Sequence, residues 1–217
     1  MLKRYTYILC LFLYILSGFI IQSRTIKDFF ISEPNDIFII LDKNTRLDLL
    51  DYYDGGRIVS TQNALGEDTQ LIDVSNNYLS IQLSESSTVE MQLIFPSKND
   101  TVIVVNQIIY TPVPDSKLMF FNKNWERLNN KNFIKEPTIE SFIDIPSSSD
   151  KKEKDILNMI EFPLISYSIN PQKNTIVVSN GLKEYLTAKE YSKISPYLKN
   201  NIEYTLKGKK YISDSEK

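Results

Sequence analysis

Histidine is absent from the 217 residues, and cysteine occurs once, at Cys10. The missing imidazole removes the commonest general base, the commonest metal ligand and the usual activator of a nucleophilic serine. One cysteine cannot form an intramolecular disulfide, so stability must come from a packed core. The six glycines form no G-x-G-x-x-G, G-x-x-x-x-G-K-[ST] or G-x-S-x-G motif. The sequence therefore gives no support to nucleotide-phosphate binding or to a serine-hydrolase elbow.

The charged residues are close to balanced. Lys and Arg total 25, Asp and Glu total 27, and the formal net charge is −2. No clustered stripe of basic residues is present to neutralise phosphates, so nucleic acid is not an expected partner. The hydrophobic fraction of 42% is typical of a globular protein and excludes collagen-like, coiled-coil and wholly disordered classes.

The N-terminus carries a long apolar run. Lys3 and Arg4 precede 14 uncharged residues, Ile8–Ile21, which are rich in Leu, Ile and Phe. This length suits the apolar part of a signal peptide and is short for a transmembrane helix, which needs about 20 residues. Residues 1–23 are therefore predicted to be a secretory signal cleaved near Ser23, which leaves an exported protein, periplasmic or secreted, without a stable membrane span. The alternative is a protein anchored in the membrane by its N-terminus.

Residues 24–56 carry helix signals. Thr25 can open a short helix, and residues 32–41 have a cap residue and an early proline before an apolar run, which predicts one or two helical turns. Thr45 is predicted to cap a helix over residues 46–54, with Gly55 as a left-handed C-cap. Apolar and acidic side chains separate onto two sides of this helix, so we expect an amphipathic surface helix.

Residues 57–128 have the period of β-strands. Apolar and polar residues alternate over 79–83 and 88–95, which predicts a hairpin of two strands with one buried face and one mostly solvated face. The run 101–110 is apolar on both faces for much of its length, which suits a central strand, and residues 117–121 form one more strand. This pattern predicts an antiparallel meander.

Four strands and one short helix are predicted after residue 155. They span residues 162–169, 175–178, 188–194 (the helix, capped by Thr187), 203–206 and 210–212. The fold class is therefore α+β, a predominantly antiparallel sheet with a few short N-terminal helices and one short C-terminal helix.

Three regions follow from this pattern. Residues 24–135 hold the N-terminal helices and the first strands. Residues 136–155 contain two prolines and a run of serine and alternating charge, which predicts a loop or linker. Residues 156–213 form a β-rich region that we expect to pack on the first as one unit.

Acidic residues are the remaining candidates for catalysis or metal binding. Asp48, Asp51 and Asp54 recur along one side of the predicted helix over 46–54. A helix presents such carboxylates in a line and not around one ion, so we interpret them as a solvated face. No residue is predicted to be catalytic, to bind a cofactor or to hold a metal, and no cofactor is expected.

Aromatic side chains are the remaining candidates for ligand contact, because rings can stack on glycans or peptides. We single out Trp125, Tyr52 and Tyr53, with Trp125 as the leading candidate because it lies just beyond a predicted strand. Tyr110, Phe120 and Phe121 are further candidates. The alternative interpretation is that these rings pack in the core.

Three segments carry a resemblance to a known family. They are NTRLDLLDYYDGG (44–56), NALGEDTQLIDVSNNYLSIQLSESSTVEMQLI (63–94) and TPVPDSKLMFFNKNWERL (111–128). They resemble a secreted family restricted to Bacteroidota, domain of unknown function 3256. That family has no assigned activity, so the resemblance implies no functional residue. It implies a cell-envelope or exported location.

Together these observations predict an exported, non-catalytic binding or envelope-associated module. Its partner would be an envelope component, a glycan or a peptide. One alternative is a periplasmic hydrolase of glycosidase type, which needs two carboxylates about 5–10 Å apart across one cleft. Another is a domain that docks a partner along an open sheet edge.

Overall fold

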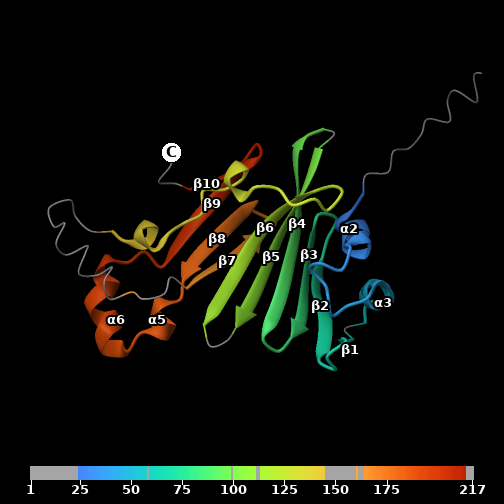
Figure 1. Ribbon diagram of the computed structural model, residues 1–217, viewed down its shortest axis with the longest axis horizontal. Coiled ribbons are helices and arrows are strands. Elements are labelled where there is room, and N and C mark those ends of the chain that lie inside the picture. Colours follow the sequence, from blue (N-terminus) through green and yellow to red (C-terminus); the bar gives the residue numbers. More distant parts are fainter. Residues whose placement is uncertain are drawn as a thin grey trace, which may run out of the picture.

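The computed structural model describes residues 24–57, 59–98, 100–110, 113–144, 160 and 164–213. Within them the strands form two antiparallel sheets, one in the order β1-β2-β3-β4-β5-β6 and one in the order β10-β9-β8-β7. In Figure 1 the strands follow one another across the molecule in sequence order, with α2 and α3 beside the first sheet and α5 and α6 at the other end. The predicted α+β class with a predominantly antiparallel sheet is confirmed.

Both sheets are meanders of consecutive strands. The six-stranded sheet consists of Thr61–Gln62 (β1), Asp68–Val74 (β2), Tyr78–Ser84 (β3), Ser87–Ser97 (β4), Asp100–Tyr110 (β5) and Pro114–Asn122 (β6). The four-stranded sheet consists of Ile165–Asn170 (β7), Thr175–Asn180 (β8), Asn201–Lys207 (β9) and Lys210–Ser213 (β10). The predicted β3–β4 hairpin and the central position of β5 are confirmed.

The first helix is specified by its cap. α2 (Ile26–Ser32) begins after Thr25, whose backbone N–H donates to Asp28 Oδ2 at 2.7 Å in a capping box. This arrangement satisfies N–H groups that have no partner inside the helix. Ile26, Phe29 and Phe30 then point into the core, so the short helix is held by burial of its apolar side.

The second helix starts earlier than the sequence predicts. α3 (Lys43–Asp54) is capped by Asp42, whose Oδ1 accepts a hydrogen bond from Thr45 N at 2.8 Å. The prediction of Thr45 as the cap is therefore wrong, because a carboxylate three residues upstream reaches its N–H group. The left-handed residue after the helix is Gly56, with φ 67°, and not Gly55, whose φ is −75°.

The segment between these helices is not helical, which corrects the turns predicted for residues 32–41. The Glu33 carboxylate accepts hydrogen bonds from the backbone N–H groups of Asn35, Asp36 and Ile37 at 2.8–2.9 Å. Asn35 also has φ 67°, which a helix does not allow. A side chain therefore takes the place of the backbone acceptors that would have continued the helix.

One face of the six-stranded sheet is covered by α2, α3 and the segment between them. Arg46 of α3 is enclosed in this layer, where its Nη1 lies 2.8 Å from Glu33 Oε2, and neither side chain is more than 1% exposed. The surrounding apolar core includes Ile26, Phe29, Phe30, Phe38, Leu41, Leu49 and Leu50 from the helical layer, and Leu79, Ile81, Leu83, Val89, Met91, Ile103 and Val105 from the sheet.

The other face of this sheet is not mostly solvated, which corrects a further prediction. Ser80, Glu90 and Asn106 point away from the helices, yet they are 8%, 8% and 0% exposed. β7 of the second sheet crosses over β5 and β6 and buries Asn106 and Glu90, which bond to its backbone. Period-two alternation distinguishes the two faces of a strand, but it does not show whether protein or water covers the polar one.

A second apolar core joins the two sheets. Phe120 of β6 stacks on Phe133, with ring centroids 4.7 Å apart, and Tyr211 of β10 lies against the same ring. Around them pack Ile94, Val102, Val104, Leu118, Phe142, Tyr167, Ile169, Ile176, Val178 and Tyr204. The segment after β6 contributes Phe133 and Phe142 and forms the 3-10 turns Asn130–Asn132 and Ile139–Phe142.

Short helices connect β8 to β9. α6 (Ala188–Ile194) has the predicted cap, since Thr187 forms a capping box with Glu190. α5 (Leu182–Tyr185) adds one further turn that the sequence did not predict, and the 3-10 turn Ser195–Tyr197 follows α6.

Candidate functional site

The edge of β7 lies on the face of the six-stranded sheet, and side chains of that sheet satisfy its backbone. Tyr167 N donates to Ser116 Oγ at 2.6 Å, and Tyr167 O accepts from Asn106 Nδ2 at 2.8 Å. Ile169 N donates to Glu90 Oε2 at 3.1 Å. The partners come from β6, β5 and β4 in turn. A strand edge that would otherwise lack partners is therefore held by polar side chains of the other sheet.

Glu90 is the centre of this junction. Its Oε2 also accepts from Asn106 Nδ2 at 2.8 Å, and its Oε1 accepts from the Tyr78 hydroxyl at 3.0 Å. No ion pair to Glu90 is present among the described residues. Burial raises the pKa of Glu90 above its ordinary value, although the hydrogen bonds from Asn106, Ile169 and Tyr78 act in the opposite direction. Burial and the nearby carboxylate likewise raise the pKa of the Tyr78 hydroxyl.

A groove of about 400 Å³ opens beside this junction, between β7 and the part of the sheet face that β7 leaves uncovered. This volume lies in the range of small-molecule sites. The groove is lined by Ile72, Ser80, Gln82, Thr88, Glu90, Ile108, Tyr110, Pro114, Ser166, Tyr167 and Ser168.

Strand register places the floor of the groove on adjacent rungs of the sheet. Gln82 pairs with Thr88, and Thr88 pairs with Ile108, across β3, β4 and β5. The next pair on the same face of the sheet is Ser80 with Glu90. Gln82, Thr88 and Ile108 lie near the ends of their strands, and Gln82 adjoins a register shift, but each is paired across the sheet, so the backbone ladder fixes its position. The floor is preformed and does not depend on a loop.

Several polar side chains of the groove have no partner within the described protein. Gln82, Thr88, Ser166 and Ser168 appear in no side-chain hydrogen bond between described residues. All four are at least partly exposed. Amide and hydroxyl groups both donate and accept hydrogen bonds, so the groove offers uncharged donors and acceptors to a ligand.

Apolar groups flank these polar ones. Tyr110 is 45% exposed and Ile72 is 52% exposed, and both line the groove. Tyr110 is the aromatic candidate that the structure places at a cavity. A half-exposed ring beside uncharged hydrogen-bonding groups suits a ligand that has both an apolar face and polar edges.

Trp125 lies elsewhere, in the loop after β6. Its ring packs on Phe121, with centroids 5.4 Å apart, on the side of the sheet that carries α2 and α3. Its indole Nε1 is buried and has no hydrogen-bond partner among the described residues, and its φ of 65° is left-handed. Trp125 is half-buried against the helical layer and does not line the groove.

Tyr52 and Tyr53 lie on α3, away from both Trp125 and the groove. The Tyr53 hydroxyl accepts a hydrogen bond from Val74 N at 3.1 Å, which ties α3 to β2. The Tyr52 ring lies 5.2 Å below the Arg57 guanidinium. α3 packs against β2, near one edge of the sheet, whereas Trp125 follows β6, the strand at the opposite edge. The structure therefore does not bring the three candidates together.

The acidic residues along α3 form no site of their own. Asp54 pairs with Lys27 Nζ at 2.5 Å, while Asp48 and Asp51 are exposed. Within the described ranges, no group of three or more His, Cys, Asp or Glu side chains is arranged to hold a metal ion. The described lining of the groove contains one carboxylate, Glu90, and not the pair that acid–base hydrolysis of a glycoside needs.

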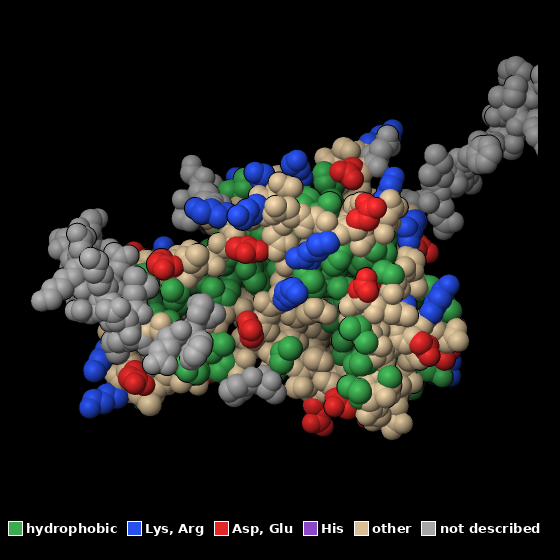
Figure 2. Space-filling model, in the orientation of Figure 1, with side chains coloured by type: hydrophobic (Ala, Val, Ile, Leu, Met, Phe, Trp, Pro, Cys, Tyr) green, Lys and Arg blue, Asp and Glu red, His purple; other side chains and the backbone are tan. Residues whose placement is uncertain are grey.

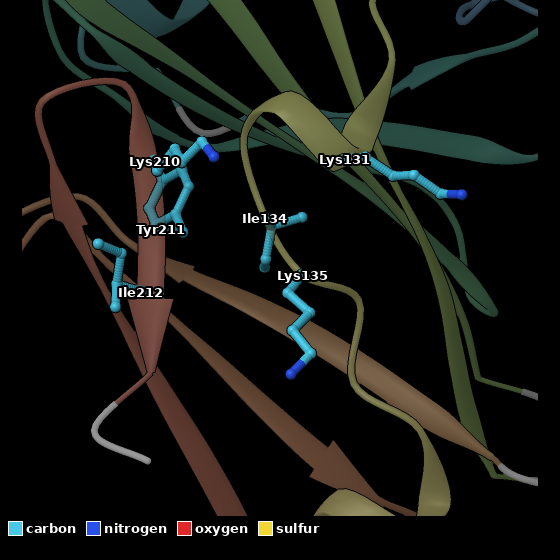
Figure 3. A pocket seen from close by; sticks show the side chains of 6 residues that line it. All are labelled: Lys131, Ile134, Lys135, Lys210, Tyr211 and Ile212. Carbon is cyan, nitrogen blue, oxygen red and sulfur yellow. The ribbon is translucent and has the colours of Figure 1, made fainter. Parts of the chain in front are cut away.

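A second cavity, of about 260 Å³, lies between β10 and the segment after β6. Its lining includes Lys131, Lys135 and Lys210. In Figure 3 the amino groups of Lys131 and Lys135 point away from one another, so they do not converge on one anion. Figure 2 shows Lys and Arg side chains gathered over β9 and β10 at the surface. We interpret them as a solvated basic surface.

Sequence reasoning missed the groove because it assigned the polar face of β3 and β4 to solvent. One signal was available. Glu90 is the only charged residue among the polar positions that alternate with the apolar ones in β3 and β4 up to Gln92. A single acidic residue on a face otherwise made of Ser, Thr and Gln indicates a carboxylate with specific hydrogen-bond partners. Local periodicity predicts neither the hydrogen bonds of Asn106 nor the position of β7 across this face.

Comparison with solved structures agrees with the fold class. A solved structure titled "Structure of a domain of an uncharacterized protein from Porphyromonas gingivalis W83" matches with a TM-score of 0.73 and 21% sequence identity. The match covers 85% of this chain and 96% of that chain. It establishes a shared arrangement of two antiparallel sheets with short helices.

The chain belongs to the family described as "Protein of unknown function (DUF3256)", which matches over residues 19–211. The resemblance noted in the sequence is thereby confirmed. A search of curated proteins found no match. None of the helices in the described part of the chain is long and apolar enough to cross a membrane.

Proposed function

We propose that this protein is an exported, non-catalytic binding module of the cell envelope, and that the groove beside β7 is its ligand site. One observation carries the proposal. Uncharged hydrogen-bonding groups without described partners line the groove, from Gln82 and Thr88 on the paired strands of its floor and from Ser166 and Ser168 on β7. Binding sites combine such fixed polar groups with apolar contacts, which Tyr110 provides here.

Export is the second part of the proposal, and it rests on the sequence. Residues 1–23 combine two basic residues with a 14-residue apolar run, Ile8–Ile21, which is the pattern of a secretory signal. N-terminal sequencing of the protein from fractionated cells tests this directly. We expect a product in the envelope or medium that begins near residue 24. A full-length product in the cytosol would contradict it.

Blocking the groove tests the ligand site. In a Cys10→Ser background, Ser168→Cys places a single thiol at the groove, and Ser192→Cys places one at an exposed position of α6. Each variant is labelled with a bulky maleimide and sedimented with isolated cell envelopes. We expect the Ser168→Cys label to reduce the bound fraction about tenfold and the Ser192→Cys label to leave it unchanged. Equal sedimentation of both labelled proteins, or none by the unlabelled protein, would overturn the proposal.

A further inference from the structure

We infer that the ligand of the groove is an uncharged carbohydrate chain, an inference that rests on the groove being the binding site. The sequence left an envelope component, a glycan or a peptide open as the ligand. The contacts that β7 makes, and the charge and shape of the lining, distinguish between these classes.

Charge excludes ionic ligands. The described lining contains no Lys or Arg, and its one carboxylate is 8% exposed and engaged by Tyr78, Asn106 and Ile169. An anion bound here would lose its hydration without gaining a cation, next to a carboxylate that repels it. A cation would find one acceptor whose oxygens already accept three hydrogen bonds. The groove therefore suits a neutral ligand.

Backbone geometry disfavours an extended peptide. Peptides that bind to sheets usually add a strand to an open edge, where main-chain groups supply the affinity. The edge of β7 nearest the groove is already engaged, because Ser116, Asn106 and Glu90 hold the backbone of Tyr167 and Ile169. The rest of the floor is the face of a sheet, which offers side chains and no free backbone ladder. A peptide would leave its own N–H and C=O groups without such partners.

The shape and chemistry of the lining fit a sugar ring. A pyranose carries hydroxyl groups around its rim and C–H groups on its faces, so it needs both hydrogen-bonding groups and a flat apolar surface. The hydrogen-bonding groups come from Gln82, Thr88, Ser166 and Ser168, each of which can donate and accept. The half-exposed Tyr110 ring supplies the apolar surface. Short side chains such as Ser and Thr also lose little rotamer freedom when they bind.

Calorimetric titration of the exported protein with defined compounds tests this inference. The neutral set is tetrasaccharides of β-1,4-linked N-acetylglucosamine, β-1,4-linked glucose, α-1,4-linked glucose and α-1,6-linked mannose. The charged and peptide comparisons are tetragalacturonate and tetra-alanine. We expect at least one neutral tetrasaccharide to bind at least tenfold more tightly than either comparison compound.

Matched variants locate that binding. Tyr110→Ala and Gln82→Ala should each weaken it at least fivefold. Tyr185→Ala removes a ring of similar exposure, 44%, on α5, and Gln107→Ala removes a half-buried glutamine on the opposite face of β5. Both of these variants should bind within twofold of the parent. Equal losses in all four variants would overturn the assignment to the groove.

The possible failures are distinguishable. Equal or tighter binding of tetragalacturonate or tetra-alanine overturns the inference, and so does the absence of binding by all four neutral compounds. If the Ser168→Cys label still abolishes envelope sedimentation in that case, the groove remains a binding site for another class of ligand. If that label has no effect, the proposed function itself fails.

Discussion

The two faces of the six-stranded sheet each bury one glutamate, and they do so in different ways. Under the helical layer, Glu33 accepts backbone hydrogen bonds from residues 35–37 and pairs with the Arg46 guanidinium at 2.8 Å. On the other face, Glu90 is held by a tyrosine hydroxyl, an asparagine amide and one backbone N–H. One carboxylate has a cation, and the other has neutral donors alone.

The helical layer closes one face of the sheet, whereas the face that carries Glu90 stays partly open at the groove. The Glu33–Arg46 pair is buried beside Phe30 and Phe38, with the guanidinium carbon 6.0 and 5.8 Å from their ring centres, and it fixes a loop that would otherwise lack regular structure. Glu90 fixes β7 across the sheet and at the same time borders the groove. A buried ion pair thus stabilises the fold of one face, and a carboxylate held by uncharged donors borders a groove on the other.

The largest expected effect comes from breaking the ion pair. Arg46→Met should reduce the free energy of unfolding by about 3–5 kcal/mol, because it leaves the Glu33 charge buried without its cation. Urea denaturation measures the loss. Arg57→Met, at an exposed arginine, is the control and should change stability by less than about 1 kcal/mol. A loss of less than about 1 kcal/mol in Arg46→Met would show that the pair does not hold this layer.

Glu90→Ala should have the next largest effect. It leaves the Ile169 N–H, the Asn106 amide and the Tyr78 hydroxyl without their acceptor, and each buried unsatisfied group costs about 1–3 kcal/mol. We expect a total loss of about 2–4 kcal/mol by urea denaturation, since some groups will find water. Glu85→Ala, in the exposed β3–β4 turn, should be close to neutral. Equal stability of the two variants would contradict the role assigned to Glu90.

Gly181→Ala tests how closely the second sheet packs on the first. A Cβ at Gly181 would lie 2.3 Å from Val113 Cγ1 and 3.2 Å from Leu164 Cβ. Overpacking of this kind costs about 1–3 kcal/mol, and we expect such a loss in thermal or urea unfolding. Lys183→Ala, exposed on the adjoining helix α5, is the control. Unchanged stability in Gly181→Ala would mean that the junction is looser than the structure indicates.

The smallest expected effect is a pH dependence. Because burial raises the pKa of Glu90 in the folded protein, the folded state binds a proton more readily than the unfolded state. The stability that this proton contributes is fully present below the unfolded pKa and is lost as pH rises through the folded pKa. Glu90→Gln cannot titrate, so the stability of the parent relative to this variant should fall with rising pH, by about 1.4 kcal/mol per unit of pKa elevation. Urea titrations between pH 4 and 8 measure this difference, and a constant difference would contradict the raised pKa.

The parts of the fold that depend on local pattern were predictable. The alternation over β3 and β4 predicted their hairpin, and Thr187 as a helix cap predicted α6. The loop between α2 and α3 was not predictable, because the sequence does not show that Glu33 would bond to the N–H groups following it and meet Arg46 thirteen residues later. Helix-start signals describe short-range preferences, and here a buried side chain outweighed them.

The candidate site was less accessible to sequence reasoning. Among the aromatic residues, Tyr110 lines the groove, whereas Trp125 and Tyr53 pack against the helical layer. Aromatic content identifies candidates but does not distinguish a ring in a core from a ring at a cavity. That distinction depends on which residues β7 covers, and the side chains that bond to β7 lie 51 to 79 positions before their partners in the sequence.

Amide chemical-shift mapping during titration with solubilised envelope polysaccharide tests most directly which face of the sheet binds ligand. We predict shifts centred on Gln82, Thr88 and Ser168, with the amides of α3 and of Trp125 unchanged. Shifts centred on α3 and Trp125, with the groove amides unmoved, would contradict this account and assign binding to the helical face.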